Sequence, residues 1–458
     1  MNKISKRSKI LYMLVFAFLI GAIFLIFTLF KNAETWALKR VNQHIYTNGQ
    51  LVSAGTIYDR NGVVLAQTVD GKRVFNPDKT IRCSTLHTVG DLSGFIATGA
   101  HYAFRSDLTG YSIIDGVYNI ERHGEDGKDL HLTIDSKLCA QAYNALGNNK
   151  GTIGVLNYKT GEIICMVSAP TFDINNKPKD IDTNDSGRYD GIYLNRFLSG
   201  VFTPGSTFKI VTAASAIDNI PDIFSRTFTC TGSYKTSTGT VVCNGVHGTV
   251  NFEKALNRSC NSAFAQIAEE LGNENLTATA ERLGFNKRIQ LDGKVNVAKS
   301  YFTLNDAVSV DRGWAGIGQY KTLANPLHMA TLMGAIASNG NCPMPHILTK
   351  KTQFFNLTPS STLRYMDITT ANQLSDMLRS NVKDFYGDSK FPNLEMCGKT
   401  GTAEVAGKKP HAWFVGFSKN PNTPLAIVVV LENSGGTGIG TAVPVANKVM
   451  QAAVNSSF

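Results

Sequence analysis

The feature that most constrains this chain is an apolar run from Ile10 to Phe30 that contains no charged residue. Four basic residues precede it, at Lys3, Lys6, Arg7 and Lys9. A helix of this length can cross a bilayer, and it is longer than the apolar core of a typical signal peptide. No convincing small-residue cleavage site follows, so we interpret the run as an uncleaved signal anchor rather than a cleaved signal peptide. The basic cluster predicts a cytoplasmic N-terminus and an extracytoplasmic remainder.

The composition describes a globular protein outside that run. The chain has 458 residues, of which 43% are hydrophobic and 17% charged, and this is enough for two domains with real cores. A formal net charge of +10 is compatible with a protein that binds nucleic acid. Beyond the N-terminal cluster the basic residues are scattered and no aromatic-interleaved basic stripe occurs, so we expect no nucleic-acid binding. Non-specific attraction to a membrane or cell wall explains the charge better.

Four segments follow from these observations. We expect a cytoplasmic tail over residues 1–9, the anchor over 10–30, a Gly-rich and strand-like domain over 31–127, and a larger domain over 128–458. The smaller domain shows no catalytic constellation.

The sequence pattern of the larger domain predicts an α/β fold of the α+β type. Its apolar alternating segments lie at both ends, and the section between residues 213 and 333 has a mainly helical pattern. Strands at both ends of a domain suggest one antiparallel sheet that both halves of the chain complete, flanked by helices and joined to a helical subdomain. The predicted strands are 152–157, 162–167, 399–405, 412–417 and 425–431, and helices are expected over 136–146 and 442–454.

The chain has eight cysteines and none forms a C-x-x-C pair. Because no His or Cys partner sits at zinc spacing, we expect no metal site. Cys230 and Cys243 flank a segment that resembles a hairpin, and they either pair in an oxidising compartment or serve as small apolar residues. Cys260 and Cys397 lie against the motifs described next, where packing is the better interpretation.

A nucleophile is predicted at Ser206. A Pro-Gly pair precedes it and a segment of small and apolar residues follows, which favours a helix that begins near Ser206 and is buried on most sides. Lys209 lies three positions further on, so the two side chains share a helical face. An amine in a desolvated pocket has a lowered pKa and can take the proton of a serine hydroxyl. The pattern Ser-x-x-Lys alone is common in proteins. It indicates a catalytic site only in combination with the two motifs that follow it.

Two further motifs follow Ser206. Ser259 and Asn261 flank one residue, which suits a turn between helices, and there the hydroxyl can relay a proton while the amide holds a peptide group. Lys399, Thr400 and Gly401 open the first of the three late strands. The lysine and threonine offer donors to a carboxylate, and the glycine allows another backbone to approach closely.

In this order the three motifs resemble the penicillin-recognising serine acyl-transferases. The chain is most similar to the class B penicillin-binding proteins, the monofunctional peptidoglycan transpeptidases. Supporting stretches lie at residues 56–62, 132–135, 316–319 and 413–416. Ala54 stands where the family usually carries Arg. The resemblance implies a transpeptidase domain over 128–458 and a pedestal or dimerisation-type domain over 31–127.

The resemblance also implies a mechanism. Ser206 attacks the carbonyl of the penultimate D-alanine of a stem peptide, and Lys209 accepts its proton. Backbone N–H groups of Ser206 and Thr402 form the oxyanion hole. Ser259 and Lys399 pass a proton to the departing D-alanine. A second stem peptide then supplies the amine that resolves the acyl-enzyme, and a β-lactam would stay attached.

Substrate binding is assigned in the same way. The resemblance implies that Asn261 binds the amide of the substrate. It also implies that the strand of Thr400, Gly401 and Thr402 binds the terminal carboxylate of the substrate. It implies no cofactor and no metal. It implies a glycan-polymerising partner, a polytopic membrane glycosyltransferase of the shape, elongation, division and sporulation (SEDS) family, along with other cell-wall synthesis proteins.

Other functions share these motifs. A D,D-carboxypeptidase would let water resolve the acyl-enzyme, and a β-lactamase or β-lactam sensor has the same signature. A catalytically silent scaffold of a wall-synthesis complex is a further alternative. Three histidines, His247, His328 and His411, are interpreted as structural because no G-x-S-x-G elbow accompanies them. The glycines of residues 435–440 miss the dinucleotide fingerprint, so we expect a loop beside the active site.

Overall fold

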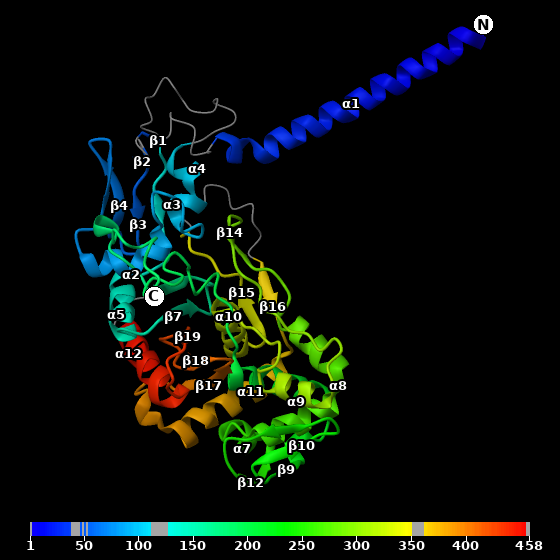
Figure 1. The fold of residues 1–458 in the computed structure, drawn as a ribbon, viewed down its shortest axis with the longest axis vertical. Coiled ribbons are helices and arrows are strands. Elements are labelled where there is room, and N and C mark those ends of the chain that lie inside the picture. Colours follow the sequence, from blue (N-terminus) through cyan, green and yellow to red (C-terminus); the bar gives the residue numbers. More distant parts are fainter. Residues whose placement is uncertain are drawn as a thin grey trace. The chain divides into compact units, whose positions relative to one another are not determined.

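Figure 1 shows the fold in the computed structural model, which describes residues 2–37, 46–47, 50–51, 54–110, 127–349 and 361–454. The chain divides into two compact units. Unit 1 contains residues 1–57, 66–74 and 104–130, and unit 2 contains 58–65, 75–103 and 131–458. The expected domain 31–127 is therefore shared between the two, and parts of it lie outside the described residues. Its boundaries stay a prediction.

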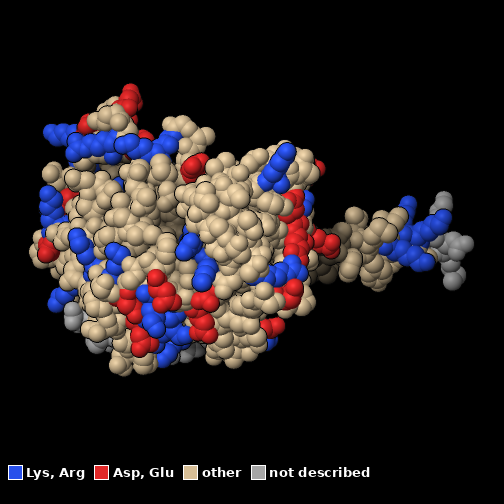
Figure 2. Space-filling view, turned by 90° about the horizontal axis from the view of Figure 1, so that it is seen from below, with Lys and Arg blue, Asp and Glu red and all other residues tan. Residues whose placement is uncertain are grey.

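Unit 1 begins with the long helix α1 (Asn2–Ala37). Within the described residues, the segment Ser5–Asn32 of α1 is the one helix long and apolar enough to cross a membrane. Figure 2 shows basic side chains gathered at its N-terminal end, followed by a stretch without charge. The unit also contains β1 (Tyr46–Thr47), β2 (Gln50–Leu51) and α4 (Arg105–Leu108). The expected apolar helix is thus present.

Four short strands cross the boundaries between the units: β3 (Ile57–Tyr58), β4 (Val64–Val69), β5 (Lys72–Phe75) and β6 (Leu130–His131). Unit 2 adds the helices α2 (Lys79–Val89) and α3 (Ala100–Ala103). The strand-like interpretation of this region missed α2. Asp78 begins that helix, since its side chain accepts hydrogen bonds from the N–H groups of Thr80 and Ile81.

The core of unit 2 is a five-stranded antiparallel sheet with the order β17-β18-β19-β7-β8. The N-terminal hairpin therefore pairs with the C-terminal meander, as the sequence predicts. In Figure 1 the teal strand β7 lies beside the orange strands of the meander. The strands are β7 (Gly151–Asn157), β8 (Ile163–Ala169), β17 (Met396–Val405), β18 (Lys408–Ser418) and β19 (Leu425–Leu431).

Helices cover this sheet, and as a result every residue of β7, β8 and β19 is buried. The helices α5 (Ser136–Leu146) and α12 (Val443–Val454) pack on each other, and they come from opposite ends of the unit (Figure 1). The apolar helix α10 (Pro326–Ala337) packs on β7, β18 and β19. Its neighbour α11 (Ile368–Ser380) packs on β17. A sheet buried on both faces is a rigid base for a site at its edge.

The section between residues 213 and 333 holds helices, as predicted. The hairpin expected between Cys230 and Cys243 is present as β10 (Ser233–Lys235) and β11 (Thr240–Val242), but the other short strands were not predicted. Residues 227–251 are rich in Thr, Val and Gly, which favour strands and turns over helix. The helices are α6 (Lys209–Asn219), α7 (Phe252–Asn257), α8 (Asn261–Arg282) and α9 (Ser309–Gly316). The strands, counted to residue 364, are β9 (Thr227–Cys230), β10 (Ser233–Lys235), β11 (Thr240–Val242), β12 (Gly248–Asn251), β13 (Gln290–Leu291), β14 (Val295–Asn296), β15 (Asn341–Pro343) and β16 (Thr362–Arg364).

An ion pair joins the segment before Ser206 to the end of β19. The guanidinium of Arg196 is buried, and its Nε lies 3.0 Å from Oε2 of Glu432. Its other nitrogens donate to the carbonyl oxygens of Asp190 and Gly191. This cation therefore holds the approach to the nucleophile against the central sheet.

We expect Arg196→Ala to lower the free energy of unfolding by about 3 kcal/mol, because it removes the donor to two carbonyl groups and the closer of the two cations that pair with Glu432, the other being Lys150 at 3.5 Å. Urea unfolding of the detergent-solubilised chain measures this. The matched control is Lys419→Ala, which removes a pair with Asp376 whose two side chains are largely exposed. That variant should change the free energy by less than about 1 kcal/mol. Equal effects of the two substitutions would contradict the assigned role of Arg196.

Candidate active site

The predicted motif residues line one cleft of about 620 Å³ in unit 2. They come from three parts of the chain: the turn before α6, the turn between α7 and α8, and strand β17. The sequence-predicted residues in the lining are Ser206, Ser259, Asn261, Lys399, Thr400 and Thr402. Lys209 lies beneath them, fully buried. The structure therefore brings together the residues that the sequence singles out.

Ser206 lies in a single 3-10 turn, η3 (Gly205–Phe208), which leads directly into α6. The helix was expected to begin near Ser206, and the tighter turn is a small difference from that expectation. Gly205 has φ +53°, a value that favours glycine, and its N–H donates to the carbonyl of Gly318. The indole Nε1 of Trp413 donates to the carbonyl of Thr203. These contacts fix the turn against β18 and hold Ser206 at the cleft.

Lys209 connects the first two motifs. Its Nζ lies 3.1 Å from Oγ of Ser206, 3.1 Å from Oγ of Ser259 and 2.8 Å from Oδ1 of Asn261. It also donates to the backbone carbonyl of Ser259 at 2.6 Å. Burial, followed by the nearby charge of Lys399, holds the pKa of Lys209 well below its usual range. A neutral amine in contact with a serine hydroxyl can accept its proton.

Ser259 lies between the end of α7 and the start of α8, which confirms the predicted turn between helices. Its φ is +53°, an unusual value for a residue other than glycine. The turn directs both its hydroxyl and its carbonyl to Lys209. Asn261, the first residue of α8, also donates through Nδ2 to the carbonyl of Val242. Asn261 is thus held from both sides.

Lys399 approaches Ser259 from strand β17. Its Nζ lies 3.1 Å from Oγ of Ser259 and 3.1 Å from the carbonyl oxygen of Thr400. Burial lowers the pKa of Lys399 to about 7. Hydrogen bonds therefore run without a break from Ser206 through Lys209 and Ser259 to Lys399. Two amines with lowered pKa values, joined by one hydroxyl, form a path for a proton.

The rest of β17 fits the predicted close approach. A Cβ on Gly401 would lie 2.6 Å from the carbonyl oxygen of Pro204, so only glycine lets the strand pack on the nucleophile turn. The N–H of Thr400 donates to the hydroxyl of Tyr386, which also contacts Oγ1 of Thr400 at 2.9 Å. The Oγ1 of Thr402 accepts from the N–H of Gly438. Thr402 is exposed at the cleft.

Several lining residues have no sequence signal that would have found them. Arg258, Trp314 and the adjacent pair Phe385 and Tyr386 come from three separate parts of the chain, and none of them is a motif residue. Tyr386 belongs to η5 (Asn381–Gly387), a π-helical turn that no periodicity indicates. Thr437, Gly438 and Ile439 also line the cleft, which confirms that the glycine-rich loop lies beside the site.

Two of the three histidines fit the structural interpretation. His328 is buried, and its ring nitrogens lie 2.6 Å from Oγ of Ser300 and 2.8 Å from the carbonyl oxygen of Leu283. Burial lowers its pKa to about 4. His411 accepts from the N–H of Asn433. His247 is different, because it lies in a cluster with three cysteines.

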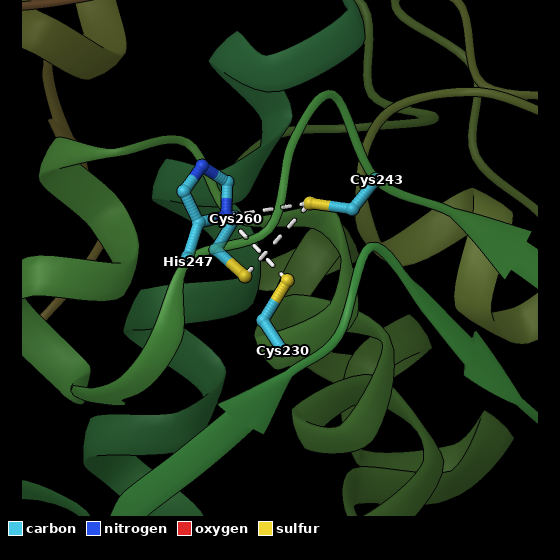
Figure 3. Close-up of side chains that lie close together, drawn as sticks. All are labelled: Cys230, Cys243, His247 and Cys260. Atoms are coloured by element: carbon cyan, nitrogen blue, oxygen red, sulfur yellow. Dashed lines mark hydrogen bonds between the residues drawn. The ribbon is translucent and has the colours of Figure 1, made fainter.

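This cluster bears on the sequence argument about metals, which rests on spacing alone. Cys230, Cys243, His247 and Cys260 come together next to the Ser259 turn, although their spacing in the chain matches no zinc motif (Figure 3). Spacing rules assume ligands on one or two short elements, whereas here the ligands come from two hairpins and a helix start. All eight cysteines are thiols in this structure, so it contains no Cys230–Cys243 disulfide.

The fold and the serine–lysine cleft define the class of penicillin-recognising serine proteins. The family model for the penicillin binding protein transpeptidase domain matches residues 151–451, and the chain belongs to this family. Among solved structures, the D,D-transpeptidase domain of a peptidoglycan glycosyltransferase from Eggerthella lenta superposes with a TM-score of 0.75 at 27% identity. That match covers 88% of this chain and 98% of the solved one.

Curated relatives agree with the family assignment. Penicillin-binding protein 3 of Bacillus subtilis is 27% identical over 376 residues, which is 76% of this chain and 55% of that protein. Peptidoglycan D,D-transpeptidase PbpA of Mycolicibacterium smegmatis is 25% identical over 364 residues, which is 72% of this chain and 73% of that protein. The aligned region thus spans about half of the first relative and most of the second.

We expect the ammonium of Lys399 to lose its proton near pH 7, and that of Lys209 to lose its proton well below the usual range of lysine. Lys399 is then cationic below pH 7 and neutral above it. Carbon NMR of chain labelled at the lysine ε-carbon measures both titrations, and Lys399→Arg assigns the signal. Titration of every lysine signal above about pH 9 would contradict the buried environment.

Proposed function

We propose that this protein is a peptidoglycan D,D-transpeptidase that cross-links stem peptides through a serine acyl-enzyme. One observation carries the proposal: a fully buried lysine amine lies 3.1 Å from the hydroxyl of Ser206, at the wall of an open cleft. A hydroxyl activated in this way is a nucleophile for acyl transfer. The family assignment and the names of the relatives support the same chemistry.

Acylation uses the first motif and the late strand. Oγ of Ser206 attacks the carbonyl carbon of the penultimate D-alanine, and Lys209 Nζ takes the hydroxyl proton. The backbone N–H groups of Ser206 and Thr402 stabilise the oxyanion. Both residues line the same cleft, and loss of such a donor costs about 3 kcal/mol in other enzymes. The lowered pKa of Lys209 supports its role as base.

The leaving group receives its proton through the second motif. As the peptide bond breaks, the hydroxyl of Ser259 donates to the amine of the departing D-alanine, and Lys209 or Lys399 reprotonates it. The 3.1 Å distances from Ser259 Oγ to both Nζ atoms support this relay. The acceptor amine of a second stem peptide then attacks the acyl-enzyme and releases Ser206. Water in its place would give a carboxypeptidase or a β-lactamase.

Substrate binding falls to Asn261 and β17. We assign the substrate amide to Asn261 and the terminal carboxylate to Thr400 and Thr402, with Lys399 as the nearby cation. Tyr386 contacts Oγ1 of Thr400 and holds it in place. Gly401 lets this strand reach the nucleophile turn. These roles, and a transpeptidase domain over 128–458, are part of the proposal.

Incubation of the purified chain with labelled penicillin should give one covalent adduct per chain, and peptide mapping should place it on Ser206. Ser206→Ala should abolish the adduct, and Lys209→Ala should slow its formation by about 10²- to 10⁴-fold because the base is lost. Ser186→Ala, on an exposed loop, is the matched control and should acylate normally. No adduct with the wild type, or an undiminished one on Ser206→Ala, would overturn the proposal.

Product analysis separates the remaining alternatives. With stem peptides that carry a free acceptor amine, cross-linked dimers should outnumber hydrolysed peptides. Hydrolysed peptides alone would indicate a carboxypeptidase, and rapid turnover of a chromogenic cephalosporin would indicate a β-lactamase. A scaffold protein would form none of these products.

We also propose that α1 is a single-pass anchor with a cytoplasmic N-terminus and an extracytoplasmic catalytic domain. The basic residues before the apolar segment support this orientation (Figure 2). A transpeptidase needs glycan strands to cross-link, so we propose a polytopic SEDS-family glycosyltransferase as partner, contacted through the anchor and the N-terminal domain.

The partner should co-purify with the full chain from detergent extract. Replacement of residues 10–30 by an unrelated apolar helix should reduce its recovery several-fold, while membrane attachment and penicillin labelling stay unchanged. Quantitative mass spectrometry of both extracts provides the measurement. Unchanged recovery of the partner would refute the role of α1 in the contact.

A further inference from the structure

Four potential metal ligands lie together beside the candidate active site, and the proposed chemistry does not use them. Cys230 ends β9, Cys243 follows β11, His247 precedes β12 and Cys260 precedes α8. Figure 3 shows their side chains pointing toward one another. The three sulfurs and a ring nitrogen of His247 all lie within 4.8 Å of one another. The three cysteines are buried and His247 is half-buried.

Three of the six separations within the cluster lie close to those of a tetrahedral zinc site. Nδ1 of His247 lies 3.5 Å from Sγ of Cys230 and 3.5 Å from Sγ of Cys243. Sγ of Cys243 lies 3.9 Å from Sγ of Cys260. Zinc bonds of about 2.3 Å to sulfur and about 2.0 Å to nitrogen, at tetrahedral angles, separate the ligand atoms by about 3.5–3.8 Å. The remaining separations are at most 4.8 Å, so small movements of the side chains would bring all four atoms to one ion.

We propose that Cys230, Cys243, His247 and Cys260 bind one Zn²⁺ ion in a closed tetrahedral site. Three soft sulfur ligands and one imidazole suit zinc, whereas magnesium and calcium prefer oxygen. On binding, each thiol releases its proton and the thiolate bonds to the metal. The partial exposure of His247 gives the ion a route from solvent.

The surrounding groups fit thiolates bound to a metal. The N–H of Asn261 points to Sγ of Cys243 at 3.2 Å, and the N–H of Ala263 points to Sγ of Cys260 at 3.4 Å. The hydroxyl of Ser262 lies 3.4 Å from Sγ of Cys230 and can turn to donate once that sulfur is a thiolate. Donors of this kind orient metal ligands and stabilise their charge.

A disulfide is the main competitor, because the site lies outside the cell in the proposed topology. A disulfide joins two of the three cysteines and requires an S–S distance of about 2.05 Å. It would leave the third cysteine and His247 without a function. A metal ion would use all four groups, three pairs of which already lie 3.5–3.9 Å apart.

The site has a consequence for the cleft, which rests on the proposed function. Cys243 lines the cleft and bonds the N–H of Asn261, whose side chain contacts Lys209. Cys260 separates Ser259 from Asn261 and begins α8. A metal bound to both cysteines would fix the turn that holds Ser259 at φ +53°. The cysteines and His247 are therefore positioning residues for the second motif.

Metal analysis tests the site directly. The full chain, purified in detergent with reductant and without chelator, should contain about one zinc per chain by inductively coupled plasma mass spectrometry. Cys230→Ser and His247→Gln should each reduce this to less than about a fifth, because a ligand is lost. Cys342→Ala, at another buried cysteine, is the matched control and should keep its zinc. A wild type without zinc after incubation with zinc chloride, or a disulfide between cluster cysteines, would overturn the proposal.

A second measurement needs no variant. Zinc should protect Cys230, Cys243 and Cys260 from alkylation, and a strong chelator should expose them at least about tenfold, while Cys342 stays unchanged. Equal alkylation with and without chelator would contradict the site. Removal of zinc should also slow penicillin acylation about tenfold or more, and zinc should restore it. Because zinc content is measured without catalysis, a chain that holds zinc but forms no adduct would contradict the proposed function alone.

Discussion

The site depends on the burial of two lysine amines around one serine hydroxyl. A buried ammonium loses the solvation that favours its charge, so the pKa values of Lys209 and Lys399 lie below the ordinary range. Each amine also raises the cost of a charge on the other. Since Ser259 contacts both, a proton that arrives on one amine can reach the other over 3.1 Å steps. The two amines therefore have their lowered pKa values before any substrate binds.

The fold supplies what the buried pair needs, which is rigid walls from distant parts of the chain. The central sheet is buried on both faces, and its edge strand β17 carries Lys399. Gly401 allows that strand to contact the turn of Ser206, and the indole of Trp413 ties the same turn to β18. The turn of Ser259 comes from the helical section and closes the third side. Displacement of any of these walls would admit water and return the amines to ordinary lysines.

Much of this arrangement is predictable from sequence because strong local signals carry it. The alternation of the late strands, the Pro-Gly pair before Ser206 and the order of the three motifs indicate the sheet, the nucleophile and the cleft. Long-range contacts carry the rest. Tyr386 reaches Thr400 from a π-helical turn that has no sequence signature. The hairpin between Cys230 and Cys243 could be predicted, but the pairing of β9 with β12 could not, and together these strands gather four potential ligands that no spacing rule connects. Helix α2 is the exception, because its cap at Asp78 could have been recognised.

The order of the motifs along the chain has a consequence for biosynthesis. Ser206 and Lys209 emerge from the ribosome long before Lys399, and strand β17 cannot pair until β18 and β19 exist. Until then Lys209 can be enclosed only by the helical section, which supplies Ser259 and Asn261, while Lys399 and its strand are missing. A chain that ends before β17 therefore carries Ser206 without the second lysine of the site. The hydrogen-bonded path from Ser206 to Lys399 is complete only once the C-terminal meander has formed.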